Sequence, residues 1–151
     1  MNNYALEQAE ELFEQALEYF LGIEKEKNMI HAKELLQQSS ELGLSKSSNL
    51  LGDWYIKKII PGDNYKEAFK LYTRGYEFGD MRSFSRLAMC YEKGYGIKKD
   101  IPKALELYEK SVELGNKDAC FSIARIYEKG ENIKMDLSKA ILWYKRGYEK
   151  G

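Results

Sequence analysis

The sequence of 151 residues has few of the side chains from which chemical sites are built. It contains one histidine, two cysteines and two prolines, and its 24 basic residues equal its 24 acidic residues. So few histidines and cysteines exclude a disulfide framework, a zinc finger and an iron–sulfur site. The zero net charge argues against a general binder of polyanions, although it permits a local basic patch. The hydrophobic content of 44% excludes wholesale disorder.

Long hydrophobic runs and targeting signals are also missing. The longest purely aliphatic stretches are pairs such as Ile59–Ile60, whereas a membrane helix needs roughly 18 apolar residues. The chain starts with acidic residues, where a secretory signal needs a positive segment followed by an apolar one. We therefore expect a cytoplasmic protein with reduced cysteines, forming one domain over residues 1–151.

Several residue types recur at a constant step of 36 residues, without one insertion. The columns are Gly43, Gly79, Gly115 and Gly151; Ala32, Ala68, Ala104 and Ala140; Tyr19, Tyr55, Tyr91 and Tyr127; Glu41, Glu77, Glu113 and Glu149; and Asn28, Asn64, Asp100 and Asp136. The step divides the chain into repeats 1 to 4, at about residues 9–44, 45–80, 81–116 and 117–151.

Each repeat has the pattern of two helices joined by a turn. Apolar and small residues follow helical spacing, and the Asn/Asp column stands where a side chain can cap the second helix of each repeat. In repeat 2, Asn64 and Glu67 also have the spacing of a capping box. One helix pair cannot bury its own apolar face, so the repeats must stack. The sequence thus predicts an all-α solenoid of eight helices.

Repeats 3 and 4 carry a specific motif. Repeat 3 reads Leu87-Ala88-Met89-Cys90-Tyr91-Glu92-Lys93-Gly94-Tyr95-Gly96, then Asp100, Lys103-Ala104 and Gly115; repeat 4 has Ile123-Ala124, Tyr127, Gly130, Asp136, Lys139-Ala140, Trp143-Tyr144 and Gly151. This motif resembles the Sel1-like repeat, a relative of the tetratricopeptide repeat. The match is weaker at Gln15-Ala16 in repeat 1 and at Lys58 in repeat 2. The resemblance implies a right-handed α/α solenoid of helix-turn-helix repeats that acts as a scaffold for other proteins.

The sequence offers little for catalysis. His31 is the only histidine, and the nearest nucleophiles in the sequence are Ser39 and Ser40. Ser39 belongs to a column of small residues, which explains it without catalysis. Cys90 and Cys120 are expected to stand too far apart for a disulfide and to act as small hydrophobic residues. We predict a non-enzyme with no cofactor and no metal.

The first helix of each repeat is expected to line the concave side of the stack. The side chains opposite its core stripe become a predicted binding face for a protein or peptide: Lys46, Asn49, Asp53 and Lys57 in repeat 2; Arg82, Ser85, Arg86, Met89 and Lys93 in repeat 3; Phe121, Arg125 and Lys129 in repeat 4. Leu50, Asp118 and Ser122 lie on the same side. In repeat 1 this side of the first helix holds Glu10, Phe13, Glu14, Leu17 and Leu21. The excess of Lys and Arg suggests an extended acidic peptide as the ligand.

Other interpretations stay open at this stage. The same charges could simply keep a scaffold solvated, while a nucleic acid is disfavoured because clustered basic and interleaved aromatic residues are lacking. In the last helix, Tyr144 and Tyr148, with Ile141 beside them, are expected to lie partly exposed, which would suit a homodimer or a longer repeat array. An inhibitor of the immunity-protein type is a third alternative. No membrane partner is expected.

Overall fold

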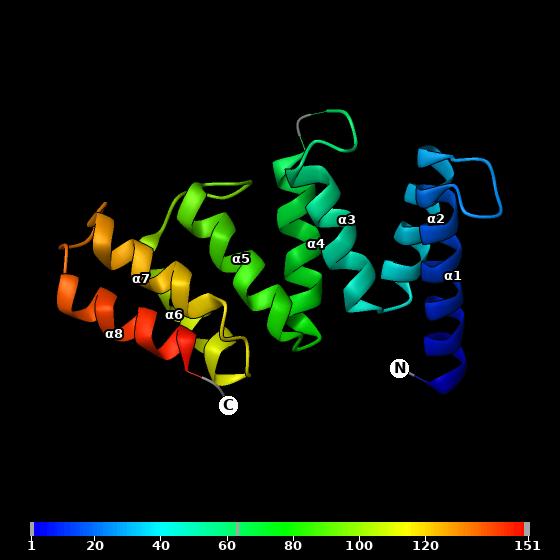
Figure 1. The fold of residues 1–151 in the computed structure, drawn as a ribbon. Coiled ribbons are helices and arrows are strands. Elements are labelled where there is room, and N and C mark those ends of the chain that lie inside the picture. The colour runs from blue at the N-terminus through cyan, green and yellow to red at the C-terminus, as the bar shows by residue number, and fades with distance from the viewer. Residues whose placement is uncertain (1, 63, 150–151) are drawn as a thin grey trace. The chain divides into compact units, whose positions relative to one another are not determined.

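The computed structural model describes residues 2–62 and 64–149, which form eight α-helices and no strand. The helices are α1 (Asn3–Leu21), α2 (Met29–Glu41), α3 (Ser45–Ile56), α4 (Tyr65–Glu77), α5 (Met81–Lys93), α6 (Ile101–Glu113), α7 (Ala119–Lys129) and α8 (Leu137–Tyr148) (Figure 1). Each predicted repeat is one helix pair, so the all-α repeat architecture is confirmed. Gly151, which closes the glycine column, lies outside the described residues.

The helices form two compact groups that divide after Asp80. The N-terminal half contains α1 to α4 and the C-terminal half contains α5 to α8. Within each half the helices pack in chain order, first helix on second, second on third and third on fourth. The paired helices run side by side in Figure 1, as α1 and α2 show in the N-terminal half.

Three of the four predicted caps are present. Asn28, Asp100 and Asp136 each accept a hydrogen bond of 3.0 Å from the backbone N–H three residues later. Asn64 does not cap α4, because its amide turns back and donates to the carbonyl of Pro61 at 3.0 Å. The predicted capping box with Glu67 is therefore wrong. The Pro61–Gly62 turn, which the other repeats lack, offers the amide a nearer acceptor.

A tyrosine of the second helix hydrogen-bonds a carboxylate of the first helix in three pairs. Tyr72 donates to Asp53 at 2.6 Å, Tyr108 to Glu92 at 2.7 Å, and Tyr144 to Glu128 at 2.7 Å. The tyrosines are 36 residues apart and so form a column of their own. The bonds of Tyr72 and Tyr108 satisfy polar groups that packing partly buries, whereas the bond of Tyr144 is exposed.

Hydroxyl pairs join α2 to α3. Ser39 Oγ lies 2.6 Å from Ser47 Oγ, Ser40 Oγ lies 2.6 Å from Ser48 Oγ, and all four residues are fully buried. Ser39 also donates to the carbonyl of Ala9 at 2.6 Å. In the C-terminal half, Ser111 makes the equivalent bond to the carbonyl of Met81 at 2.8 Å. These bonds account for the small-residue column in which Ser39 stands.

Candidate functional site

A groove runs between α5 and α7 in the C-terminal half. One part of it, about 370 Å³, is lined by Ser85, Arg86, Met89, Glu92, Lys93, Tyr108, Asn116, Asp118, Ala119, Ser122 and Arg125. A second hollow of about 640 Å³ continues it, shares four of these residues and adds Met81, Arg82, Gly115 and Lys117. We call the two together the α5–α7 groove. Six of the predicted binding residues line this groove: Arg82, Ser85, Arg86, Met89, Lys93 and Arg125.

The floor of the groove is a tyrosine that the sequence interpretation missed. Tyr108 comes from α6, behind α5 and α7, and donates to Glu92 Oε2 at 2.7 Å. Burial, reinforced by the charge of Glu92, raises the pKa of the Tyr108 phenol well above its usual value. The phenol therefore stays protonated and acts as a hydrogen-bond donor. The repeat of Tyr72, Tyr108 and Tyr144 was the sequence signal that could have revealed it.

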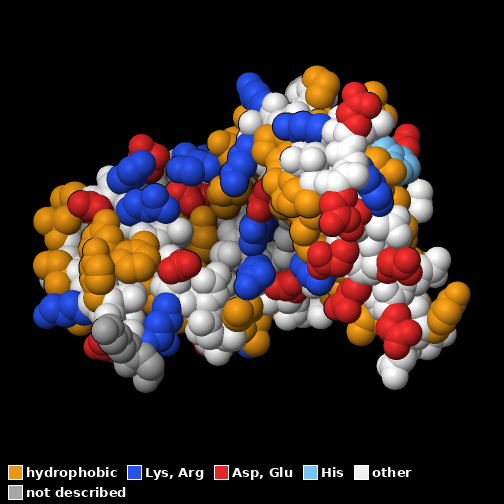
Figure 2. Space-filling view, turned by 45° about the vertical axis from the view of Figure 1, so that its right-hand side comes forward, with side chains coloured by type: hydrophobic (Ala, Val, Ile, Leu, Met, Phe, Trp, Pro, Cys, Tyr) orange, Lys and Arg blue, Asp and Glu red, His pale blue; other side chains and the backbone are white. Residues whose placement is uncertain are grey.

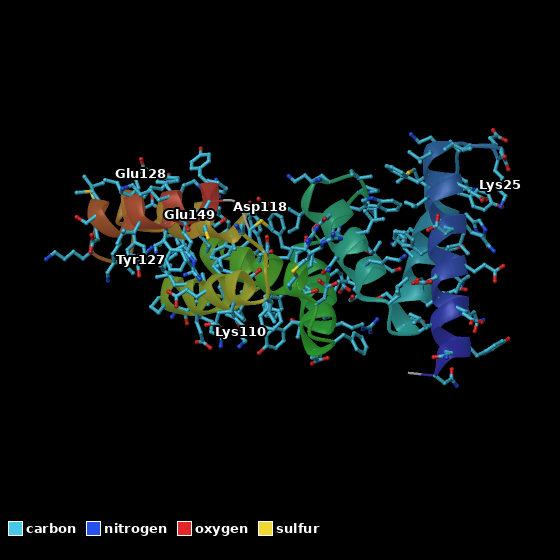
Figure 3. The ribbon with its side chains drawn as sticks, turned by 60° about the horizontal axis from the view of Figure 1, so that its bottom comes forward. Lys25, Lys110, Asp118, Tyr127, Glu128 and Glu149 are labelled. Atoms are coloured by element: carbon cyan, nitrogen blue, oxygen red, sulfur yellow. The ribbon has the colours of Figure 1, made fainter. Side chains whose placement is uncertain are left out.

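The charged side chains of the groove favour anions. Glu92 is engaged by Tyr108 and also lies 3.1 Å from the Lys93 ammonium. Arg125 donates to the neutral hydroxyl of Ser122 at 3.2 Å. Asp118 stands at the start of α7 (Figure 3) and, with Glu92, completes the acidic lining. The basic lining consists of Arg82, Arg86, Lys93, Lys117 and Arg125.

Phe121 does not face the groove. Its ring lies 5.1 Å from that of Tyr148 and 6.4 Å from that of Tyr144, so it packs against α8. The glycine at position 147 makes room for it, because a Cβ there would come within 2.9 Å of Phe121 Cζ. The sequence interpretation placed Phe121 on the open side, and the structure corrects this. Lys129 is exposed and lines a separate hollow of about 120 Å³ with Glu92 and Lys93.

The predicted residues of repeat 2 lie in the N-terminal half, and two of them have structural roles. Asn49 is 3% exposed and donates to Asp80 at 3.4 Å, so its predicted place on an open face is wrong. Asp53 is partly buried and accepts the bond from Tyr72. Its amide faces Asp80, in the turn after α4.

Lys46 and Lys57 remain at the surface of the N-terminal half. The Lys46 ammonium lies 4.5 Å from the centre of the Phe13 ring and 3.9 Å from Glu10 Oε1. Lys57 is exposed just after α3. The positive charge of Lys46 is thus partly matched by repeat 1, which the sequence interpretation treated as a separate acidic face.

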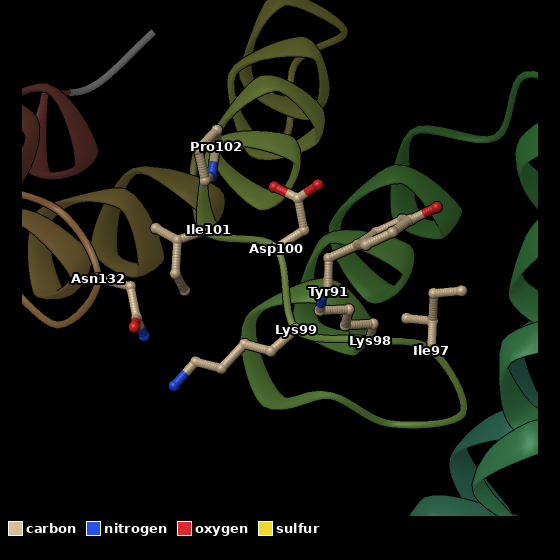
Figure 4. Close-up of a pocket in the computed structure, with 8 residues that line it drawn as sticks. All are labelled: Tyr91, Ile97, Lys98, Lys99, Asp100, Ile101, Pro102 and Asn132. Atoms are coloured by element: carbon tan, nitrogen blue, oxygen red, sulfur yellow. The ribbon is translucent and has the colours of Figure 1, made fainter.

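Loops form a further pocket in the C-terminal half (Figure 4). It measures about 560 Å³ and is lined by Tyr91, Ile97, Lys98, Lys99, Asp100, Ile101, Pro102 and Asn132. Lys99 lies 3.8 Å from Glu131, and Asp100 is committed to capping α6. This pocket pairs no nucleophile with a base, so it has no evident chemistry.

The remaining candidates for chemistry have structural partners. His31 packs edge-on against Tyr19 at 4.5 Å and lies 3.5 Å from Glu34, while Ser39 belongs to a hydroxyl pair. Cys90 and Cys120 are buried and free, as predicted, and burial raises the pKa of Cys90 to about 12. Over residues 2–62 and 64–149, no cluster of three or more His, Cys, Asp or Glu side chains could hold a metal ion. No described helix is long and apolar enough to cross a membrane.

The stacked helix pairs and the groove between their first helices define an α/α repeat protein. The Sel1 repeat model matches residues 12–44, 47–80, 85–116 and 117–151, and the chain belongs to the Sel1 repeat family. Proteins of this family are generally protein-interaction scaffolds and are typically non-catalytic. A comparison with curated protein sequences gives no match.

Solved structures of other repeat proteins share the fold. A Sel1 repeat protein from Oxalobacter formigenes is 31% identical over 95% of this chain, with a TM-score of 0.84. A protective antigen of uropathogenic Escherichia coli is 26% identical over 92%, with a TM-score of 0.80. Cysteine rich protein B of Helicobacter pylori is 22% identical over 78% of this chain, with a TM-score of 0.62. The alignment covers 87% of the Helicobacter protein. The chain spans 59% and 30% of the first two proteins.

Proposed function

We propose that this chain is a non-catalytic scaffold that binds an acidic segment of a partner protein in the α5–α7 groove. The observation that carries the proposal is the gathering of Arg86, Lys93 and Arg125 around Met89 in one groove. The ligand is an extended peptide whose carboxylates pair with the two arginines and whose apolar side chain rests on Met89.

The physical chemistry of the groove suits such a ligand. Guanidinium groups form paired, charge-assisted hydrogen bonds with carboxylates, so Arg86 and Arg125 can fix the direction of the peptide. Methionine is flexible and polarisable, and it accepts apolar side chains of different shapes. Both helices are preformed, so the backbone of the chain loses little conformational freedom on binding, and the entropic cost falls on the peptide and on the side chains that contact it. Several shallow contacts on a rigid surface then give moderate affinity with specificity by charge.

A library of random ten-residue peptides, selected on the full chain, tests the proposal. Wild type should enrich sequences with several Asp or Glu residues around one apolar residue. The variant Arg86→Glu/Arg125→Glu should lose these sequences at least tenfold, because reversed charges repel the carboxylates. Circular dichroism checks that both proteins are equally helical.

The matched control is Lys98→Glu/Lys134→Glu, which changes the net charge equally at two exposed loop positions. It should select the same peptides as wild type. Enrichment without acidic bias, or equal binding by all three proteins, would sink the proposal and leave the groove as a solvated face. Retention of nucleic acid through the same two arginines would instead favour the nucleic-acid interpretation.

A further inference from the structure

The α5–α7 groove has two unlike ends, because α5 and α7 run in the same direction along it (Figure 1). Residues 81–82 at the start of α5 and 117–118 just before α7 line the hollow of about 640 Å³, which we call the wide end. Lys93 and Lys129, the last residues of the two helices, line the hollow of about 120 Å³. This hollow shares Lys93 with the groove, and we call it the narrow end.

The wide end has an excess of positive charge. Arg82, Arg86 and Lys117 line it, and Asp118 is the single acidic residue of its lining. Lys117 donates to the main-chain carbonyl of Glu149, a neutral group that does not cancel its charge. The N-terminal ends of α5 and α7 add the positive poles of two helix dipoles, which favour negative groups nearby. The wide end is thus the part of the groove that is most favourable to carboxylates.

The charges of the narrow end are largely matched. Lys93 lies 3.1 Å from Glu92, and Lys99 lies 3.8 Å from Glu131. In Figure 2, basic and acidic side chains lie close together along the upper edge of the C-terminal half, on the left. The C-terminal ends of α5 and α7 are the negative poles of their dipoles, which Lys93 and Lys129 offset. The narrow end therefore attracts carboxylates less strongly than the wide end does.

Apolar side chains lie in the middle of the groove and at its narrow end. Met89 is half-buried in the lining of the groove, and Ile101 and Ile126, each 4% exposed, line the narrow end. Along α5 the order is Arg82, Arg86, Met89 and then the narrow end with its isoleucines. A ligand that matches this order carries its acidic residues on one side of its apolar residues.

The length of α5 sets the size of such a ligand. From Met81 to Lys93 the helix advances by roughly 18 Å, at about 1.5 Å per residue. An extended peptide advances about 3.3 Å per residue, so roughly five or six residues span the groove. A block of three acidic residues followed by two apolar residues fills this length.

We propose that the α5–α7 groove binds its peptide in one orientation, with an acidic block at the wide end and apolar residues over Met89 and at the narrow end. Arg82 and Lys117 are the residues that determine this orientation. The inference rests on the proposed function and adds a polarity to the ligand. Either direction of the peptide main chain satisfies it.

Spin-labelled peptides bound to the full chain test the orientation. The probe is Ser-Gly-Glu-Glu-Glu-Leu-Leu-Gly-Ser with capped termini, carrying a nitroxide at its acidic end or at its leucine end. The reversed sequence, labelled in the same two ways, covers the other main-chain direction, and the tighter binder is used. The acidic-end label should broaden the NMR amide signals of Arg82 and Lys117 at least threefold more than those of Lys93 and Lys129. The leucine-end label should do the reverse.

The outcomes separate this inference from the proposed function. Equal broadening at both ends of the groove, or an acidic-end label that acts mainly on Lys93 and Lys129, would overturn the inference and leave the groove as the binding site. Broadening confined to residues outside the groove, or no binding of either sequence, would overturn the proposed function and this inference with it.

The variant Arg82→Gln/Lys117→Gln gives an independent readout. It removes two positive charges from the wide end and should weaken binding of the probe at least threefold, measured by fluorescence anisotropy. The matched control, Lys98→Gln/Lys134→Gln, removes the same charge from exposed loop positions and should bind as wild type does. Circular dichroism checks that all three proteins are equally helical. Equal weakening by both variants would show that only net charge matters and would contradict the role of Arg82 and Lys117.

Discussion

The tyrosine–carboxylate bonds occur at different depths. Tyr72 is fully buried, Tyr108 is 3% exposed, and Tyr144 is half-buried on the last helix. Loss of a buried partner leaves a carboxylate without its hydrogen bond, whereas water can replace an exposed one. The three tyrosines thus form a graded series within one protein.

Tyr72→Phe should lower the free energy of unfolding by about 1–2 kcal/mol, because Asp53 loses a buried donor. Tyr144→Phe, the matched control, should cost less than about 0.5 kcal/mol, because the bond to Glu128 is exposed. Urea unfolding followed by circular dichroism measures both. Equal losses would show that burial does not set the worth of these bonds.

The buried thiol of Cys90 makes the stability of the folded protein depend on pH in the alkaline range. Burial raises the pKa of its thiol from 9.0 to about 12. Between these values the unfolded thiol is ionised while the folded thiol keeps its proton, so stability falls as the pH rises. The slope contributed by this one group is at most about 1.4 kcal/mol per pH unit.

We therefore expect Cys90→Ala to have a smaller loss of stability between pH 9 and 11 than wild type. Urea titrations at pH 8, 9, 10 and 11 give the two slopes, and the comparison of slopes removes the constant cost of the lost side chain. Identical slopes would contradict the link. In the native protein Cys90 should also resist alkylation at pH 8, because its thiolate is scarce.

At the scale of the elements, Gly52 fixes how closely α3 and α4 pack. A Cβ at this position would lie 2.5 Å from Cε1 of Tyr72. The tyrosine reaches Asp53, next to Gly52, so its ring lies directly on the glycine. In the α1–α2 pair the same two columns hold Ala16 and Leu36, both fully buried. In both helix pairs, a small residue on the first helix thus packs against a larger residue on the second.

Gly52→Ala should cost about 1–3 kcal/mol through overpacking, although alanine is the better helix former. Gly52→Ala/Tyr72→Leu recreates the Ala16–Leu36 pair, so alanine should be harmless or favourable in the Tyr72→Leu background. A double-mutant cycle by urea unfolding measures the coupling between the two positions. Additive effects would show that the ring does not set the spacing.

Periodicity predicted the elements well because one pattern, repeated in register, fixes helix number, order and pairing. It failed where one contact overrides the pattern. Asn64 turns to Pro61, Asn49 faces Asp80, and Phe121 fills the space above Gly147. For Asn49 and Phe121, the outcome depends on how far the helix is rotated about its own axis. Spacing within one helix cannot specify that rotation, because it depends on the neighbouring helix.

The candidate site was predicted in part for the same reason. Arg86, Met89 and Arg125 lie on exposed turns of α5 and α7, and sequence spacing placed them on one side. Tyr108 and Asn116 come from α6 and the turn after it, so they required knowledge of how three helices meet. The residues at the floor of a groove depend on how the helices pack together, whereas those at its rim can be predicted from the spacing along one helix.

For the whole molecule, a net charge of zero conceals a local imbalance. Five basic residues line the α5–α7 groove against Glu92 and Asp118, and the ion pair of Glu92 with Lys93 still leaves three arginines and Lys117 against Asp118. Salt screens such charges over roughly 10 Å at 0.1 M and 3 Å at 1 M.

Acidic peptides selected on the groove should therefore bind about tenfold more weakly at 0.5 M than at 0.05 M sodium chloride. Fluorescence anisotropy measures the two affinities. The Lys98→Glu/Lys134→Glu control should show the same salt dependence as wild type, and a salt-independent affinity would mean that Met89 and its apolar neighbours dominate.

The hydroxyl pair of Ser39 and Ser47 also constrains how the sequence can diverge. Ser39 donates to the Ala9 carbonyl, so Ser47 supplies the proton between the two oxygens. If Ser47 is lost first, Ser39 keeps its bond; if Ser39 is lost first, a hydroxyl and a carbonyl are stranded in the core. At the α6–α7 step, Ser111 still binds the Met81 carbonyl while Ala119 stands in the column of Ser47. At both steps the serine bond to the backbone carbonyl is kept, whereas the second hydroxyl is dispensable.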